Sequence, residues 1–427
     1  FALKMTIDKA LEISPELKSM YDSDETTRKV IDMARAIEGM PRHASTHAAG
    51  VVISKLPLDE YVPLYLTDKG LATQFNMTTI EELGLLKMDF LGLRNLTIIR
   101  DALEMIRENH GVDIDFSRME YDDPAVYEII SQGNTQGLFQ LESGGMTSFM
   151  KNLKPDCFED IVAGIALYRP GPMASIPTYI DNKRNPGHVK YVHESLKPIL
   201  GVTYGCMVYQ EQVMQIVRSL AGYSMGEADN IRRAMSKKKQ YVIDAGREDF
   251  VHGNKEKNID GCVNRHIDEK VANEIYDSMT DFAKYAFNKS HAACYAVVAY
   301  QTAWLKYYYP LEFMAALMTS VIDNPGKTSE YIMACKSMGI KILPPDVNSG
   351  EADFAVADNA IRYALTAIKG VGRNVIDNIA KERELYGPYR NLEDFITRNM
   401  SKELNKRVVE SLIKAGALDG FGATRKQ

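Results

Sequence analysis

A lysine and an aspartate stand two residues apart in Lys87-Met88-Asp89-Phe90, within the segment Leu85–Arg94. In an extended chain successive side chains point to opposite faces, so Lys87 and Asp89 would share one face. Met88 and Phe90 would lie on the other face and are expected to pack on a core. A carboxylate beside an ammonium suits a site for a metal ion and a phosphate. A site that bridges metal ions needs two or three carboxylates, however, and no second one stands nearby on that face.

Five cations fall within eight residues from Arg232 to Lys239, in a chain whose net charge is −6. The planar fork of an arginine suits pairs of phosphate oxygens, so Arg232 and Arg233 could both reach a triphosphate. The alternative is a solvated basic helix face. Apolar residues at helical spacing would anchor this helix and fix its arginines, which favours phosphate binding. The apolar residues are Ala228, Ile231, Ala234 and Met235.

The run Asn288-Lys289-Ser290-His291 places an amide, a cation, a hydroxyl and an imidazole directly before a long apolar helix that reaches Tyr308. Ser290 is the expected N-cap, and the amides of the first turn can bind an anion. A ligand-facing role for this segment and a structural role as a helix cap or core histidine both remain open. The aromatic residues between 295 and 309 are expected to pack in the core rather than to form a stacking platform.

Two histidines, His43 and His47, lie four residues apart and would share a helix face that could bind zinc. No third ligand stands at a suitable spacing, and the glycine and extended run that follow argue against a long helix. A zinc hydrolase is therefore the least favoured alternative. Contacts to phosphate or backbone are preferred to zinc, and local structural hydrogen bonding is preferred to both.

Two glycines bracket Val371 in the segment Ala367–Ile376, with a helix expected on either side. A tight hairpin of this kind exposes backbone N–H groups to a phosphate, and neighbouring cations add charge, so it can hold a DNA backbone without reading sequence. A degenerate copy follows near Ala415. Residues 366–427 hold twelve lysines and arginines against eight aspartates and glutamates, a local charge of +4. The predicted DNA-binding residues are Lys369, Gly370, Gly372, Arg373, Lys414 and Gly416.

The elements that must position these residues indicate a mainly α fold with a small α+β part. Residues 1–42 have helical spacing, residues 45–94 contain short extended runs, and the chain after Arg94 is mostly helical. A break at Leu343–Asp346 precedes a short β-like piece at 354–363 and further short helices. At 427 residues the chain can hold two to four domains.

Composition sets the compartment and excludes some functions. No apolar run approaches the roughly 18 residues that span a bilayer, so a soluble protein is expected. The five widely spaced cysteines suggest neither a disulfide framework nor a zinc site, and a reducing cytoplasm fits them best. The net charge of −6 argues against nucleic-acid binding by the chain as a whole, so such binding must rest on local clusters. Because the first residue is Phe1 rather than methionine, we expect a fragment of a longer protein.

Taken together, these blocks resemble the C-family bacterial replicative polymerases, the α subunits of DNA polymerase III, over essentially the whole chain. The motifs that carry the likeness are His47–Ile53, Lys87–Arg94, Gly137–Ser143, Tyr168–Met173, Tyr209–Met214, Arg232–Lys239 and Phe287–Ala292. The resemblance implies a partial thumb at 1–44, the second part of the palm at 45–94, fingers at 95–345, and at 346–427 a β-like connector with a tandem helix-hairpin-helix.

The resemblance also implies an activity and its partners. The activity is template-directed DNA synthesis, by nucleotidyl transfer from a deoxynucleoside triphosphate to a primer 3′-hydroxyl. The complete site would hold two Mg²⁺ ions. Primer-template DNA and deoxynucleoside triphosphates would be the substrates. In the full-length protein a sliding clamp and other replisome subunits would be partners.

Residue roles follow from the matched motifs. Asp89 matches the third of three palm aspartates that hold the metal ions, and Lys87 matches a triphosphate contact. Arg232 and Arg233 match the finger residues that clamp the triphosphate. The segment that faces the incoming sugar and base would supply Asn288, Ser290 and His291, the last a candidate for rejecting ribonucleotides. The two hairpins match the pair that holds duplex DNA.

The departures from the family pattern matter equally. The Asp-x-Asp strand motif of the family's palm does not occur here and is expected upstream of residue 1, as is a phosphoesterase-like domain. Clamp-binding and OB-fold regions are expected beyond residue 427. The chain alone is therefore predicted to be inactive. The alternative from another class is a non-catalytic DNA-binding module that uses the helix-hairpin-helix motifs.

Overall fold

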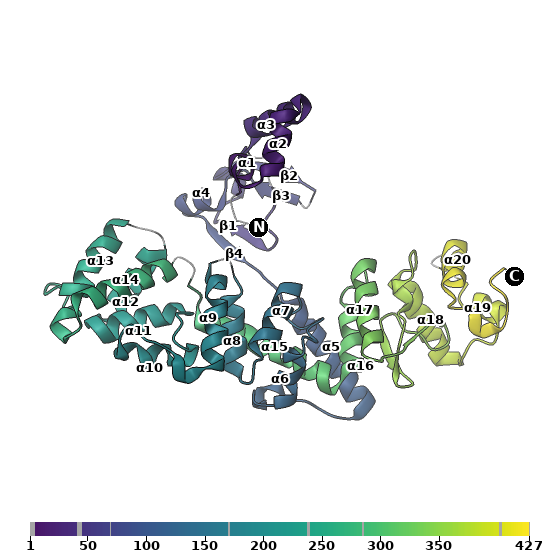
Figure 1. Ribbon diagram of the computed structural model, residues 1–427. Coiled ribbons are helices and arrows are strands. Elements are labelled where there is room, and N and C mark those ends of the chain that lie inside the picture. Colours follow the sequence, from purple (N-terminus) through teal and green to yellow (C-terminus); the bar gives the residue numbers. More distant parts are fainter. Residues whose placement is uncertain are drawn as a thin grey trace. The chain divides into compact units, whose positions relative to one another are not determined.

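The computed structural model describes residues 5–40, 45–68, 70–169, 171–236, 240–283, 286–400 and 404–426. The chain divides into two compact units, Phe1–Gly92 and Leu93–Gln427 (Figure 1). No helix within these described ranges is both long enough and apolar enough to cross a membrane.

The first unit begins with three helices, α1 (Ile7–Ile13), α2 (Pro15–Ser23) and α3 (Glu25–Ile37). Each has a side-chain N-cap, and the Asp24 carboxylate accepts hydrogen bonds from the first-turn amides of α3. The helical prediction for this region is confirmed over its described part. The apolar stripe of α3 is left exposed, because no residue of that helix is buried.

Two small antiparallel sheets and one short helix follow in the same unit: β1 (Gly50–Ile53), β2 (Leu64–Thr67), β3 (Gly70–Thr73), α4 (Met77–Glu82) and β4 (Leu86–Asp89). Strand β1 pairs with β4, and β2 pairs with β3. The predicted extended runs and the strand that carries Asp89 are therefore confirmed.

The core of this unit lies on the face of β4 opposite to the expected one. Val52 stands opposite Lys87 in the register, and Val52 packs against the small core around Ile80. Because paired residues share a face, the core lies on the side of Lys87. Met88 is 42% exposed and Phe90 63% exposed. The expectation that these two side chains pack on a core is wrong. The two-stranded ribbon is covered by the core on one face, and that face carries Lys87.

The second unit is almost entirely helical, which confirms the mainly α prediction. Its helices are α5 (Arg94–His110), α6 (Pro124–Ser131), α7 (Gly144–Leu153), α8 (Phe158–Leu167), α9 (Ile176–Arg184), α10 (Lys197–Leu200), α11 (Gln210–Ala221), α12 (Met225–Ser236), α13 (Gln240–His252), α14 (Glu269–Ala283), α15 (Lys289–Tyr308), α16 (Pro310–Thr319), α17 (Pro325–Ser337), α18 (Arg373–Tyr386), α19 (Leu392–Arg398) and α20 (Lys406–Ala415).

A three-stranded sheet interrupts these helices near residue 350. It consists of β5 (Ile342–Leu343), β6 (Ala355–Ala357) and β7 (Ala360–Arg362), with β7 in the middle, parallel to β5 and antiparallel to β6. The β-like piece was predicted as two short runs. The third strand, β5, was missed because it is two residues long and pairs with a partner almost twenty residues away.

Helix α15 is the centre of the largest core and packs against α5, α6, α8 and α16 (Figure 1). Tyr300 is fully buried there, whereas Tyr307 and Tyr308 are exposed, so the predicted core role holds for only part of the aromatic series. A second core joins α11 to α14, and a third lies beneath the carboxyl-terminal hairpins.

The middle of α15 also anchors the loop that precedes α7. The buried Lys306 ammonium donates hydrogen bonds to the carbonyl oxygens of Asn134, 2.9 Å away, and Gln136, 2.8 Å away. The Thr302 hydroxyl accepts one from the backbone N–H of Phe139 at 3.1 Å. Burial lowers the pKa of Lys306 to about 8. This buried cation has no carboxylate within ion-pair distance among the described residues, and it fixes the loop through backbone carbonyls.

Candidate functional site

Lys87 and Asp89 lie on one face of β4, as predicted, and contact each other. The Lys87 ammonium donates a hydrogen bond of 2.5 Å to Asp89 Oδ1. The lysine side chain is 12% exposed and the aspartate side chain 42%. This hydrogen bond, with the charge of the lysine, holds the pKa of Asp89 below its usual value. The carboxylate is therefore ionised and faces solvent.

Gly50 makes this arrangement possible from the neighbouring strand. It stands opposite Asp89 in the register. A Cβ atom at Gly50 would lie 2.8 Å from Lys87 Cε, 2.8 Å from His47 Nδ1 and 2.9 Å from Asp89 Oδ1. Real Cβ atoms essentially never approach other atoms this closely, so the cluster keeps this arrangement only with glycine at this position.

His47 has a structural role in the described structure. Its Nδ1 accepts hydrogen bonds from the backbone N–H groups of Ala49, at 3.2 Å, and Gly50, at 2.6 Å. The same atom lies 3.8 Å from Asp89 Oδ1, but it carries no proton to donate while it accepts from the backbone. This is the local hydrogen bonding that the sequence favoured over zinc. The other histidine of that alternative, His43, lies outside the described residues.

Among the described residues, Asp89 belongs to no group of three or more potential metal ligands. Within the described ranges, the residues grouped closely enough to hold a metal ion are Asp156, Cys157 and Asp160, where Lys183 already supplies the cation. The Asp-x-Asp sequences of the chain, Asp22–Asp24 and Asp113–Asp115, lie at helix ends and in a loop rather than on a strand. Asp89 alone is one oxygen ligand of the kind that Mg²⁺ takes, and Mg²⁺ needs further oxygens from carboxylates or substrate phosphates.

Arg232 and Arg233 lie on α12 and share one aspartate. Arg232 donates from Nε and Nη2 to Asp229 Oδ1, at 3.0 and 2.6 Å, and Arg233 Nη2 lies 2.7 Å from Asp229 Oδ2. The Arg232 side chain is 18% exposed and that of Arg233 is 64% exposed. The arginines hold the pKa of Asp229 below its usual value. Both guanidinium groups are therefore oriented by an internal anion.

The rest of this basic cluster is partly described. The four predicted core residues of α12, Ala228, Ile231, Ala234 and Met235, are all buried, so the helix is anchored as expected. The remaining cations of the cluster, Lys237–Lys239, lie outside the described residues.

A glutamine links Arg232 to the segment before α15. The Gln210 amide oxygen accepts a hydrogen bond from Arg232 Nη1 at 3.0 Å, and its Nε2 donates to the carbonyl oxygen of Ala286 at 2.9 Å. The backbone N–H of Gln210 also donates to the carbonyl of Phe287 at 2.9 Å. Gln210 therefore joins two predicted groups of site residues that are more than fifty residues apart in the sequence.

Asn288, not Ser290, is the N-cap of α15. Its Oδ1 accepts a hydrogen bond of 2.8 Å from the backbone N–H of His291, and its Nδ2 donates to Glu211 Oε1 at 2.8 Å. Glu211 also accepts from the backbone N–H of Lys289. The prediction for Ser290 is wrong because this carboxylate fixes the helix start two residues earlier. Ser290 consequently lies exposed in the first turn.

His291 is exposed beside Ser290 on that turn. Its ring packs between two aromatic rings, those of Tyr295, at 4.3 Å between centroids, and Phe287, at 5.3 Å. The imidazole is therefore held by ring contacts rather than buried as a core histidine.

The first glycine hairpin lies between β7 and α18. Gly370 has a left-handed backbone with φ +86°, and Gly372 is the N-cap of α18 without a side chain to satisfy the first-turn amides. Lys369 is exposed, whereas Arg373 is paired with Asp353. The helix expected before this hairpin is only the 3₁₀ turn Leu365–Ala367, because β7 ends three residues earlier.

The second hairpin follows α20. Gly416 ends that helix with φ +84°, and the 3₁₀ turn Asp419–Phe421 follows. Lys414 is exposed, 3.8 Å from Glu410. Both hairpins pack on one core, which contains Val371 and Ala417. The structure thus brings the two predicted glycine motifs together on the same hydrophobic core.

Sequence reasoning missed the residues that position the predicted ones: Gly50, Gln210, Glu211 and Asp229. The glutamine and glutamate lie in the motif Tyr209–Met214, so a signal existed without a role. Asp229 stands three and four residues before the arginines, which is the spacing of ion pairs on a helix. The opposition of Gly50 to Asp89 requires the strand register, which the sequence does not contain.

Comparison with known families gives the class of this fold and site. Residues 1–92 match the model of the bacterial DNA polymerase III alpha NTPase domain, residues 95–258 match that of the bacterial DNA polymerase III alpha subunit finger domain, and residues 339–427 match a helix-hairpin-helix motif. The fold and site therefore fall in the class of bacterial DNA polymerase III α subunits.

Individual relatives agree over the whole chain. It is 47% identical to DNA polymerase III subunit alpha of Thermus aquaticus, 48% to that of Bacillus subtilis and 45% to that of Escherichia coli K12, each over 99% of this chain. The chain belongs to the family of DNA polymerase III α subunits. It spans about a third of the length of these relatives, 34–37%.

Proposed function

We propose that this chain supplies the incoming-nucleotide site and a duplex-binding region of a replicative DNA polymerase. The enzyme transfers a nucleotide from a deoxynucleoside triphosphate to a primer 3′-hydroxyl under direction of a template. The observation that carries the proposal is the junction at Gln210, which holds Arg232 of α12 against the segment that leads into α15. The basic helix α12 and the polar start of α15 are thereby held side by side through Gln210.

In this proposal the arginines release the carboxylate of Asp229 when they bind the triphosphate. The triphosphate takes the place of Asp229 on the guanidinium groups of Arg232 and Arg233, whose planar forks bind pairs of phosphate oxygens. Asn288, Ser290 and His291 face the sugar and base at the start of α15. Support comes from the exposure of Ser290 and His291 and from the fixed orientation of both arginines.

Asp89 and Lys87 are proposed to belong to the catalytic centre. Asp89 would hold Mg²⁺ together with substrate phosphates and carboxylates from elsewhere in the protein, and the bound ions would neutralise charge on the reacting phosphoryl group. Lys87 keeps the carboxylate of Asp89 ionised. In the bound state the Lys87 ammonium would donate to a phosphate oxygen in place of Asp89 Oδ1. Because Asp89 has no carboxylate neighbour in its own described unit, the chain alone is expected to bind substrates without catalysing extension.

The glycine hairpins are proposed to hold duplex DNA through backbone N–H groups and the exposed Lys369 and Lys414. For the whole polymerase we propose a sliding clamp and other replisome subunits as partners. We also propose a cytoplasmic location.

A binding experiment tests the proposal. The chain is titrated with a deoxynucleoside triphosphate in the presence of Mg²⁺ and primer-template DNA. Arg232→Ala should weaken nucleotide binding at least tenfold, and Arg233→Ala several-fold, with DNA affinity unchanged. Arg218→Ala, an exposed arginine on α11, is the matched control. DNA binding that falls with salt and ignores nucleotide would instead indicate the non-catalytic DNA-binding module.

A second experiment tests Asp89 in the polymerase that contains this chain. Asp89→Ala should abolish primer extension and leave primer-template affinity nearly unchanged, because the carboxylate acts on the metal rather than on DNA. Equal losses of binding and of rate would show that Asp89 is structural and would contradict the proposed role.

A further inference from the structure

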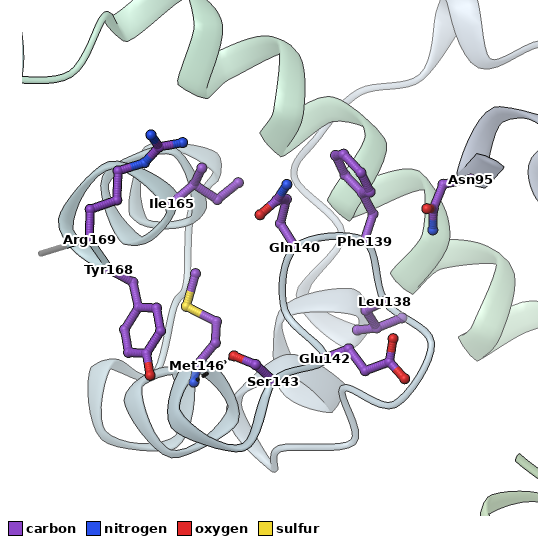
Figure 2. Close-up of a pocket in the computed structure, with 10 residues that line it drawn as sticks. All are labelled: Asn95, Leu138, Phe139, Gln140, Glu142, Ser143, Met146, Ile165, Tyr168 and Arg169. Atoms are coloured by element: carbon purple, nitrogen blue, oxygen red, sulfur yellow. Dashed lines mark hydrogen bonds between the residues drawn. The ribbon is translucent and has the colours of Figure 1, made fainter. Parts of the chain in front are cut away.

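A cavity of about 480 Å³ lies between the start of α5, the end of α8, the start of α7 and the loop before α7 (Figure 2). Its size falls within the roughly 300–1,000 Å³ of ligand pockets. Figure 2 shows Phe139, Gln140 and Glu142 coming from the loop, and Ile165, Tyr168 and Arg169 from α8 and the residues after it. The proposed function gives this cavity no role.

The polar side chains of the cavity are available to a ligand. Those of Asn95, Gln140 and Arg169 make no hydrogen bond or ion pair with any residue that the structure describes. Glu142, in contrast, is compensated by the Tyr331 hydroxyl at 2.8 Å and the Lys327 ammonium at 3.5 Å. Two amides, one guanidinium and the Tyr168 hydroxyl are therefore left to bind a ligand. Because the guanidinium is the one cation among these four groups, they do not suit a triphosphate.

Gln140 is held in the cavity by a disfavoured backbone. Its φ is +61°, in the left-handed region that residues other than glycine and asparagine rarely adopt. Lys306 and Thr302 of α15 fix the loop on the amino-terminal side of Gln140. Such conformations persist where the surroundings over-determine them, and they gather at binding and active sites.

The walls of the cavity are joined to His291 by a series of ring contacts. Phe139 packs on Tyr295 at 5.1 Å, and Tyr295 packs on His291 at 4.3 Å. On the other side the Arg169 guanidinium lies over the Phe287 ring at 3.7 Å, and Phe287 packs on His291. The cavity therefore borders the segment to which the proposed function assigns the incoming sugar and base.

We propose that this cavity receives an unpaired nucleobase, with the Gln140 amide and the Arg169 guanidinium at the edge of the base. Amide and guanidinium groups bind base edges in pairs of hydrogen bonds, and unstacked bases pack on aromatic and guanidinium planes. The stacked guanidinium of Arg169 keeps its N–H groups free for such bonds. The inference rests on the proposed function, and the base can come from the template strand or from the incoming nucleotide.

Photocrosslinking to the chain tests the inference with two probes. One is a primer-template with 4-thiothymine as the first unpaired template base, and the other is 4-thiothymidine triphosphate with unmodified primer-template and Mg²⁺. After irradiation the adducts are mapped by mass spectrometry. Adducts in 138–146 or 165–169 from either probe support the inference, and the probe that gives them identifies the source of the base.

Variants separate base contact from folding. Gln140→Ala and Arg169→Ala should each reduce the adduct yield at least fivefold, whereas Gln136→Ala, an exposed glutamine outside the cavity, should leave it unchanged. Gln140→Gly should lose the adduct and yet raise the melting temperature, because glycine accepts the left-handed backbone. That pair of changes excludes a folding defect as the cause.

Two negative results have different meanings. Adducts confined to other peptides, or yields that no cavity variant changes, would overturn the inference while the proposed function stands. A chain that binds neither probe would overturn both.

Discussion

Gly50 lies directly opposite Asp89 in the pair of β1 and β4, and the space where a side chain would stand is bordered by atoms of His47, Lys87 and Asp89. A proposed catalytic carboxylate thus depends on the absence of a side chain on the neighbouring strand. The atoms that border the space belong to side chains, so they can move aside without unfolding the sheet.

Gly50→Ala should therefore separate stability from activity. The Lys87–Asp89 contact must shift to admit the methyl group, and a displacement of about 1 Å at a reacting centre can cost about 100-fold in rate. We expect primer extension to fall by this order in the polymerase that contains the chain. The melting temperature of the chain should change little, and the pKa of Asp89, measured by NMR, should rise toward its usual value. An unchanged pKa would contradict the crowding argument.

Gln210→Ala should weaken nucleotide binding without removing any group that touches the nucleotide. It deletes the hydrogen bonds to Arg232 and to the carbonyl of Ala286, together about 1–3 kcal/mol of net stabilisation. In the polymerase that contains the chain, we expect a KM for the incoming nucleotide several-fold higher and a smaller change in kcat. Gln210→Glu keeps a partner for Arg232 but repels the Ala286 carbonyl, so its KM should be intermediate. A purely structural role would lower the melting temperature in both variants and leave KM unchanged.

Lys306→Met should remove a pH dependence of stability. Burial lowers the pKa of this lysine to about 8 from an ordinary 10.5. Between these values the unfolded chain binds more protons at this residue than the folded protein, so the free energy of unfolding rises with pH. The full rise corresponds to about 3 kcal/mol, which the methionine variant should lack. Urea unfolding of both proteins from pH 7.5 to 9.5, a window that covers about 2 kcal/mol of this rise, measures the difference.

Groups that do not interact with Lys306 titrate equally in the wild type and in Lys306→Met, whereas the pKa of Cys335, which the charge of Lys306 lowers, should rise in the variant. Burial raises the pKa of Tyr300 to about 12, for example, and its contribution cancels when the two proteins are compared. Parallel stability curves for wild type and variant would show that Lys306 is not the source of the dependence.

Lys369→Ala and Lys414→Ala should each weaken duplex binding and lower the slope of log affinity against log salt by about 1, because each removes one phosphate contact. Arg373→Ala should have a smaller effect, since its guanidinium is paired with Asp353. Fluorescence anisotropy with a short duplex at several salt concentrations measures both quantities. Lys336→Ala, an exposed lysine on α17, is the control. Equal slopes for all four variants would place DNA elsewhere.

The sequence predicts local geometry well wherever one periodicity decides it. The alternation that puts Lys87 and Asp89 on one face, and the helical spacing that buries Ile231 and Met235, are both found in the structure. The prediction that Met88 and Phe90 are covered fails, because alternation identifies two faces but not the one that meets the core.

The remaining features depend on contacts between distant segments. Ser290 is a reasonable cap by local preference. The start of α15 is set instead by Glu211, which accepts a hydrogen bond from the backbone N–H of Lys289, 78 residues away in the sequence. Gln210 reaches Ala286 across 76 residues. No spacing rule contains such contacts, so the roles of Gln210 and Glu211 emerge only from the fold.

In the proposed function, the aspartate shared by Arg232 and Arg233 makes phosphate binding an exchange of anions. A triphosphate that takes the N–H groups now bonded to Asp229 must displace that carboxylate, which then repels it. An anion of single charge gains little from that exchange, whereas a magnesium-bound triphosphate can engage both arginines at once and outweigh the lost pairs. In this proposal Asp229 favours multivalent phosphate ligands over anions of single charge at the two arginines.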